Sequence, residues 1–203
     1  MSTNKELIFN MVQSGVLKSG KIIKAFENID RKYFVPEYFS TEIYGDYPLP
    51  IGKDQTISQP STVAFMLELL DAKEGNKVLD IGSGSGWTTA LLSEIVGKDG
   101  EVTGVERVEK LVEVGQKNLA FFDFKNTKIE LATELLGKPK KKFDRILVSA
   151  SAPQIPVELF EQLNAGGVLV VPVKNSIFRF KKMPDLSIQK SEYIGFRFVP
   201  LIY

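Results

Sequence analysis

The stretch VLDIGSGSG, residues 78–86, decides the fold. Residues 77–81 form a short apolar run of the kind that makes a buried strand. The glycines that follow allow a tight turn into a helix predicted over residues 88–96. Ligands of open parallel sheets bind at the carboxyl ends of the strands, where such a turn lies. The stretch therefore predicts both a strand–turn–helix unit and the position of a ligand site.

On the C-terminal side of this stretch, strands and helices alternate. Further strands are expected over residues 101–105, 127–132, 143–149 and 168–171, and helices over residues 108–120 and 156–163. Such alternation predicts a parallel sheet covered by helices on both faces. Residues 176–182 and 193–201 flank a polar stretch, which predicts an antiparallel hairpin. We therefore expect an α/β fold with a doubly wound, mostly parallel, seven-stranded sheet that ends in an antiparallel hairpin.

The N-terminal side has a different pattern. Two amphipathic helices are predicted over residues 5–13 and 21–29, the second with Ser19 as its N-cap. Residues 31–58 show no regular period, and a loop of this length in a compact domain is usually functional. A helix is expected to begin at Pro60 and run toward residue 70, because proline is well tolerated in the first turn. We therefore interpret residues 1–58 as an N-terminal helical extension of the same domain and residues 59–203 as its α/β part.

The composition excludes several classes of protein. The chain has 203 residues, 43% of them hydrophobic, with 26 basic against 25 acidic side chains and a mean hydropathy of -0.03. It contains no Cys and no His, which excludes disulfides, thiolate catalysis and His-based triads, and it predicts no metal site. No apolar run approaches the 18–20 residues, roughly, of a membrane span, and no signal peptide is evident. We expect a cytoplasmic protein without nucleic-acid or membrane partners.

The glycine turn indicates a particular ligand. Its spacing is G-x-G-x-G rather than the G-x-G-x-x-G that holds a pyrophosphate. Asp80, just before the glycines, would repel a phosphate but suits a ligand with an ammonium group. Glu106, at the end of the second strand, can accept both hydroxyls of a ribose. S-adenosylmethionine carries an ammonium group and a ribose but no phosphate, so we expect it as the cofactor.

Two further features of the sequence each allow two interpretations. Glu134 follows the strand predicted over residues 127–132. In this position it either contacts the adenine of the cofactor or begins a helix at the surface. The strongest charge cluster is formed by Lys138, Lys140, Lys141 and Lys142. It is interpreted as a solvated loop, with an RNA contact as the alternative.

Motifs along the chain show a family resemblance. They read IDR at 29–31, FVP at 34–36, YGDYPLPIG at 44–52, QTISQP at 55–60, VLDIGSGSG at 78–86, VER at 105–107, FDRILV at 143–148, APQIP at 152–156 and FVPL at 198–201. Over almost its whole length the chain resembles the protein-L-isoaspartate O-methyltransferase family. The loop at 55–60 is the signature segment of that family.

The resemblance implies a fold, a reaction and a set of site residues. The fold is the sheet of S-adenosylmethionine-dependent methyltransferases, and the reaction transfers a methyl group to the α-carboxylate of L-isoaspartyl residues in aged proteins and peptides. The ester then collapses to a succinimide, which begins repair. Ser58 corresponds to the active-site residue of the family. The resemblance also implies substrate binding by Gln55, Thr56 and Ile57, and cofactor binding by Asp80, Gly82, Ser83, Gly84, Ser85, Gly86, Glu106 and Arg107. We expect a monomer.

The reaction explains why the chain needs no general base. A carboxylate is already ionised at neutral pH, so alignment and exclusion of water are the main tasks. We expect the Ser58 hydroxyl to orient the carboxylate, with an N-cap for the helix at Pro60 as the alternative role. One segment departs from the family: Ala132-Thr133-Glu134 stands where the family usually has Gly-Asp-Gly. Either Thr133 substitutes as a hydrogen-bonding group near the adenine, or Glu134 reaches back to it.

Three other functions compete with this interpretation. A methyltransferase of the same fold acting on RNA or a small molecule is the nearest, but residues 149–153 carry no aromatic side chain to stack on a flipped base. A non-catalytic S-adenosylmethionine-binding protein is the second, supported by the altered segment at Thr133. A nicotinamide-dependent oxidoreductase is the weakest, because of the glycine spacing.

Overall fold

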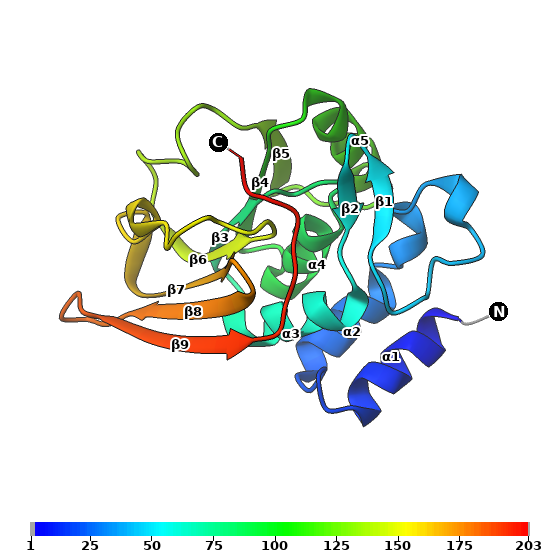
Figure 1. Cartoon of the computed structure of the whole chain (residues 1–203), viewed down its shortest axis with the longest axis horizontal. Helices are drawn as coiled ribbons and strands as arrows, with labels where there is room; N and C mark the ends of the chain where they lie inside the picture. Colours follow the sequence, from blue (N-terminus) through cyan, green and yellow to red (C-terminus); the bar gives the residue numbers. More distant parts are fainter. Residues whose placement is uncertain (1–2, 203) are drawn as a thin grey trace.

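The computed structural model describes residues 3–202. In this range the main sheet has seven strands in the order β5-β4-β3-β6-β7-β8-β9, and β1 and β2 form a separate hairpin (Figure 1). The elements are α1 (Asn4–Gln13), α2 (Gly20–Asn28), η1 (Arg31–Tyr33), η2 (Glu37–Phe39), β1 (Leu49–Gly52), β2 (Gln55–Ile57), α3 (Pro60–Leu70), β3 (Lys77–Ile81), α4 (Trp87–Val96), β4 (Glu101–Glu106), α5 (Glu109–Leu119), β5 (Thr127–Leu131), β6 (Phe143–Val148), η3 (Val157–Leu159), β7 (Leu163–Val173), β8 (Ser176–Lys182) and β9 (Ile188–Ile194).

The centre of the sheet confirms the predicted parallel, doubly wound arrangement. Strand β3 pairs in parallel with β4 on one side and with β6 on the other. Its side chains are buried on both faces from Val78 to Ile81, which is why the sequence shows a continuous apolar run instead of an alternating one. Strands β7, β8 and β9 close the sheet in antiparallel order. The carboxyl ends of β3, β4, β5 and β6 therefore meet along one edge.

The two faces of the sheet are covered differently. Helices α3, α4 and α5 pack on the face that carries Val78 and Val102, and together they form one core. The connections that follow β5 and β6 cross the other face, where Leu136 and Leu159 share a second core with Leu79. The predicted cover of α-helices on both faces is therefore wrong, because within residues 3–202 these connections contain only the 3-10 helix η3. The helix predicted over residues 156–163 is wrong. Only the short 3-10 helix η3 forms there, because β7 already begins at Leu163 and leaves no room for a longer helix.

The N-terminal helices are confirmed, and they pack on the core of the sheet. Phe26 of α2 meets Trp87 at the start of α4 edge-to-face, with 5.6 Å between the ring centroids. Ser19 is at the N-cap position of α2 but makes no cap hydrogen bond. The predicted N-cap position is therefore confirmed, but the hydroxyl donates to Glu68 of α3 at 2.5 Å and ties two helices together instead of capping α2. Because the extension shares the core, we infer that residues 1–58 and 59–203 form one folding unit.

The segment 31–58, predicted as irregular, contains the β1–β2 hairpin. Leu49 pairs with Ile57 across it. The turn residues Lys53 and Asp54 both have positive φ, 56° and 58°, as the twist of a two-residue hairpin turn requires. Neither residue is glycine or asparagine, which usually mark such a turn. The hairpin holds the signature loop beside the glycine turn (Figure 1).

The C-terminal part is partly as predicted. Strand β8 is confirmed, but the strand predicted over residues 193–201 is wrong, since β9 ends at Ile194. Gly195 has a φ of +108° and turns the chain out of the sheet. Residues 195–202, which we call the C-terminal segment, then run back across the carboxyl ends of the strands (Figure 1). Ser151 holds this segment with two main-chain hydrogen bonds, to Val199 and from Leu201. No helix within residues 3–202 is long and apolar enough to cross a bilayer.

Candidate active site

Three adjoining cavities lie at the carboxyl ends of β3, β4 and β6. The strand-end cavity lies between the glycine turn, the end of β4 and the C-terminal segment. The inner cavity lies between the signature loop and the glycine turn, and the outer cavity lies between the signature loop and residues 197–199. Thr56 and Ser149 line all three cavities. These two hydroxyl side chains therefore mark the point where the cavities meet.

The glycine turn allows close approach from the strand-end cavity. Gly82 and Gly84 have φ values of +80° and +53°, and both line the cavity. Gly86 lines none of the three cavities. A Cβ there would lie 3.1 Å from Ile129 and 3.2 Å from the carbonyl of Gly115, so Gly86 allows α5 to pack closely. The structure gives Gly86 this packing role, and its contact with the cofactor stays a prediction.

Glu106 is the carboxylate on the wall of the strand-end cavity. It is only 7% exposed. One oxygen accepts from the main-chain N–H of Gly84 and the other from that of Val108, each at 2.9 Å. Two main-chain donors thus fix the carboxylate plane, while each oxygen keeps a lone pair for a ligand hydroxyl. This geometry fits the predicted contact with a ribose.

Asp80 is completely buried behind the turn and lines none of these three cavities. Its carboxylate accepts from the hydroxyls of Thr88 and Thr89 at 2.7 Å, and from Ser149 at 3.4 Å. Burial raises the pKa of Asp80 above its ordinary value, the hydroxyl donors oppose this shift, and Glu106 adds to it. Asp80 therefore orients Thr88 and Ser149, which line the inner cavity, and its own contact with the cofactor stays a prediction.

Ser83, which lines the inner cavity, has a buried hydroxyl without a partner in the described part of the chain. Ser83 is 4% exposed, and its buried Oγ has no hydrogen-bond partner in residues 3–202. Ser85 lines the same cavity. An unpaired buried hydroxyl is costly, so a polar ligand group that bonds it would be favoured. Both serines thus lie beside the cavity, and their contact with the cofactor stays a prediction.

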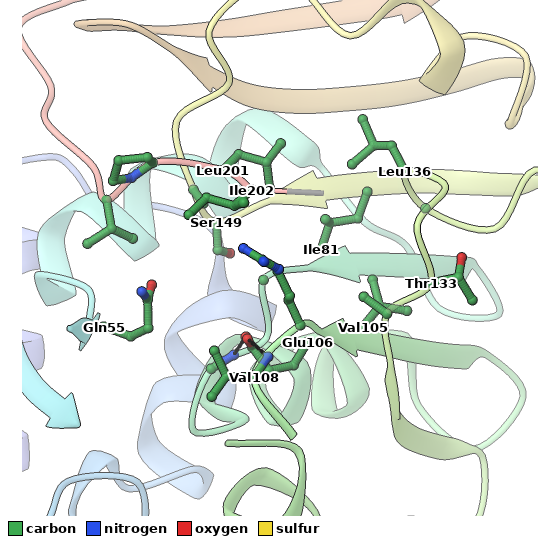
Figure 2. A pocket seen from close by; sticks show the side chains of 18 of the residues that line it. Gln55, Ile81, Val105, Glu106, Val108, Thr133, Leu136, Ser149, Leu201 and Ile202 are labelled. Carbon is green, nitrogen blue, oxygen red and sulfur yellow. Dashed lines mark hydrogen bonds between the residues drawn. The ribbon is translucent and has the colours of Figure 1, made fainter. Parts of the chain in front are cut away.

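The far wall of the strand-end cavity distinguishes Thr133 from Glu134. Figure 2 shows Gln55 on one side of the cavity and Thr133 on the other, with Glu106 between them. Thr133 lines the cavity, whereas Glu134 is exposed and does not reach it. The structure therefore favours substitution by Thr133 over the alternative in which Glu134 reaches back. The wall around Thr133 is apolar, as an adenine ring requires, and includes Val105, Val108, Leu136, Leu201 and Ile202.

The signature loop divides its side chains among the cavities. Gln55 lines the strand-end cavity rather than the outer one, and Ile57 is 5% exposed and belongs largely to the core. Ser58 lines both the inner and the outer cavity, and no hydrogen bond from its hydroxyl is found in the described residues. The N-cap of α3 is Gln59, so the capping role considered for Ser58 is wrong. The helix is capped instead by Asp46, which accepts from the N–H of Ser61 at 2.9 Å.

Arg31 ties the main chain of this loop to residues 43–47. It is fully buried, and its guanidinium donates to four carbonyls, those of Ile43, Gly45, Tyr47 and Ser58. It also lies over the ring of Trp87, 5.3 Å from the centroid. Burial lowers the pKa of Arg31 to about 10, so the guanidinium is still charged at neutral pH. Arg31 was named from the sequence only as part of the IDR motif, and this role was not predicted.

Several other residues of the site were missed by sequence reasoning. Ser149 directly follows β6, so the rule that ligands bind at strand ends would have found it. Most of the C-terminal segment was predicted as part of a strand over residues 193–201, yet it lines the strand-end cavity from Val199 to Ile202. Nothing in its local pattern indicates that position, because only the tertiary fold brings it there.

Comparison with known proteins identifies the family. The family model described as "Protein-L-isoaspartate(D-aspartate) O-methyltransferase (PCMT)" matches residues 2–203. This chain belongs to that family. A protein-L-isoaspartate O-methyltransferase 1 of Archaeoglobus fulgidus is 43% identical over 185 residues, covering 90% of this chain and 86% of the relative. A protein-L-isoaspartate O-methyltransferase of Pyrococcus horikoshii is 40% identical over 204 residues, covering 98% and 92%.

A solved structure supports the same assignment. A beta-aspartate methyltransferase of the PCMT family from Plasmodium falciparum, in complex with S-adenosyl-L-homocysteine, superposes with a TM-score of 0.88 at 26% identity. The match covers 100% of this chain and 99% of that one. The chain is thus a methyltransferase that uses S-adenosylmethionine. The fixed carboxylate of Glu106, the free hydroxyl of Ser83 and the apolar wall near Leu136 fit that cofactor.

The lysine cluster of this methyltransferase is partly occupied by internal contacts. Lys138 forms an ion pair with Glu130, and Lys142 donates to the carbonyl of Glu161. Lys140 and Lys141 are exposed. The cluster therefore presents fewer free cations than its sequence suggests, which favours the interpretation as a surface loop.

Proposed function

We propose that Ser58 orients the α-carboxylate of an L-isoaspartyl residue for methylation by this protein-L-isoaspartate O-methyltransferase. The observation that carries the proposal is the position of the Ser58 hydroxyl. It lies on the wall shared by the inner and outer cavities, and it makes no hydrogen bond within residues 3–202. A carboxylate that enters from the outer cavity meets this donor before it reaches the glycine turn.

The residues of the chain align the reactants and exclude water. S-adenosylmethionine supplies the methyl group as a sulfonium. One carboxylate oxygen forms the new bond to the methyl carbon, and the electron pair of the broken carbon–sulfur bond stays on sulfur, so no proton has to move. Attack by an anion on a cation removes two charges, and a poorly hydrated site therefore favours it. Thr56 and Ser149 border the meeting point of the cavities and shield it from water.

Other residues are assigned to the cofactor. We assign Glu106 to the ribose hydroxyls and Thr133 with the apolar wall to the adenine. Gly82, Gly84, Ser83 and Ser85 face the methionine part, and Asp80 acts through Thr88 and Ser149. Since all these residues come from a single chain, we infer that a monomer is sufficient for activity. The cytoplasmic location stays a prediction from the sequence.

A methyl-transfer assay tests the proposal. Labelled methyl transfer is measured to two synthetic peptides that differ only in an L-isoaspartyl or a normal aspartyl linkage. We expect base-labile methylation of the isoaspartyl peptide alone. Ser58→Ala should lower kcat by about 10- to 100-fold, since misaligned reactants lose rate on this scale. Cofactor binding and the melting temperature should stay near those of the wild type.

Ser191→Ala is the matched control for Ser58→Ala. Ser191 is an exposed serine of the edge strand β9, and the same loss of a hydroxyl there should leave turnover unchanged. Full turnover by Ser58→Ala would refute the orienting role. Equal methylation of both peptides would refute the assigned acceptor.

A further inference from the structure

The five arginines of the chain fall into two groups. Three of them donate to main-chain carbonyls and thereby hold the fold together. Arg31 donates to carbonyls of residues 43–58, Arg145 donates to Asp71 and Asp144, and Arg179 donates to Leu69. Their hydrogen bonds are already used within the protein, so their role is structural.

The other two arginines, Arg107 and Arg197, each face a cavity. Neither makes a hydrogen bond or an ion pair with any residue of the range 3–202. Arg107 lines the strand-end cavity and Arg197 the outer cavity. Arg197 is exposed, and it is the one charged side chain on the described wall of the outer cavity, which otherwise consists of hydroxyl, amide and apolar groups. An unpaired guanidinium thus faces the path of an anionic substrate.

The main chain on both sides of Arg197 is fixed. Phe196 stacks on Phe65 of α3 with a centroid distance of 5.3 Å, and its N–H donates to the carbonyl of Asn175. Two residues after Arg197, the carbonyl of Val199 accepts from the N–H of Ser151. The side chain therefore starts from a defined point beside the cavity that Ser58 lines.

We propose that Arg197 is a specificity-determining residue that recognises the negative charge of the substrate α-carboxylate. The inference rests on the function proposed above and deepens it. A guanidinium bonds a carboxylate through two parallel N–H groups, and such charge-assisted bonds are about twice as strong as neutral ones. Methyl transfer turns the carboxylate into a neutral ester, which the guanidinium holds less well. Arg197 thus favours binding of the substrate and release of the product.

A binding cycle separates this role from a structural one. Binding of two peptides is measured to the protein loaded with S-adenosyl-L-homocysteine: one has an L-isoaspartyl residue, and the other has its uncharged α-carboxamide. We expect Arg197→Gln to weaken binding of the isoaspartyl peptide about tenfold, equivalent to about 1.4 kcal/mol. The affinity for the carboxamide peptide should change by less than about twofold. The tenfold difference should shrink at high salt because the side chain is exposed.

Turnover provides the second measurement. Arg197→Gln should raise KM for the isoaspartyl peptide with kcat within about twofold of the wild type, and Arg197→Lys should restore part of the loss because it keeps the charge. Lys77→Gln is the charge control, since Lys77 is exposed at the start of β3, at the opposite end of the strand from the cavities. Its parameters should match those of the wild type.

Each outcome bears on a different statement. If Arg197→Gln weakens both peptides equally, or weakens neither, Arg197 does not recognise the carboxylate and the inference is overturned while the methyltransferase activity stands. If the wild-type protein fails to methylate the isoaspartyl peptide, the proposed function itself fails, and the inference fails with it.

Discussion

Replacement of Arg31 tests how the signature loop is held. In Arg31→Met, a side chain of similar length loses every donor, and four carbonyls lose a charged partner: those of Ile43, Gly45, Tyr47 and Ser58. A hydrogen bond to a charged group contributes about 1.5–3 kcal/mol, so the four bonds together form a large term.

We expect the free energy of unfolding of Arg31→Met to fall by about 3–5 kcal/mol, the scale of a broken buried ionic contact. Arg31→Lys should lose less, because it keeps the charge. It still cannot reach four carbonyls with three donors, and it loses the planar contact with Trp87. Urea unfolding at neutral pH measures both variants. Turnover of the folded fraction should fall as well, because the carbonyl of Ser58 is released.

A neighbouring residue provides the control. Lys32 is half-exposed, and its ion pair with Asp30 at 3.4 Å is on the surface. Lys32→Met should therefore change the free energy of unfolding by no more than about 0.5 kcal/mol. If Arg31→Met were within about 1 kcal/mol of the wild type, the four hydrogen bonds would not stabilise the loop and the reasoning would be refuted.

Two more predictions concern stability. Asp46→Ala should lower the free energy of unfolding by about 1 kcal/mol, because α3 loses the carboxylate that accepts from Ser61. Denaturant unfolding of Asp46→Ala and of the less severe Asp46→Asn measures this loss, and an unchanged midpoint for Asp46→Ala would contradict it. Lys128 and Lys138 hold the pKa of Glu130 at about 2, below its ordinary value of 4.5, so the stabilisation from this carboxylate is present above pH 4.5 and is lost as the pH falls toward 2. Glu130→Gln should flatten the pH dependence of stability in that window by less than about 1 kcal/mol, because the pair is partly exposed, whereas an unchanged slope would show that the ion pairs contribute nothing.

The parts of the fold that the sequence predicted correctly depend on local patterns. The run that becomes β3, the glycines after it and Glu106 at the end of β4 are each specified by residues close in sequence. Their juxtaposition then follows from the rule that parallel strand ends share one edge. For this reason the sequence alone predicts a ligand site at the edge where the strand-end cavity lies.

The parts that were wrong depend on tertiary packing. Lys53 and Asp54 form a hairpin turn without the usual glycine or asparagine, so the β1–β2 hairpin had no recognisable signal. The residues of η3 form a single turn because strand β7 already begins at Leu163. Arg197 is close in sequence to a motif, but its free guanidinium and its cavity are visible only in the structure.

The pairing of β3 with β6 has a consequence for the order of folding. Val78 lies opposite Arg145 in the sheet, although β4 and β5 lie between them in the sequence. Closing so long a loop costs conformational entropy before the contacts between β3 and β6 can stabilise the chain, and sheets with such pairings fold slowly. Ser149, at the meeting point of the cavities, reaches its place only when β6 has joined β3. A refolding chain therefore regains its helices before it regains a site where any ligand can bind.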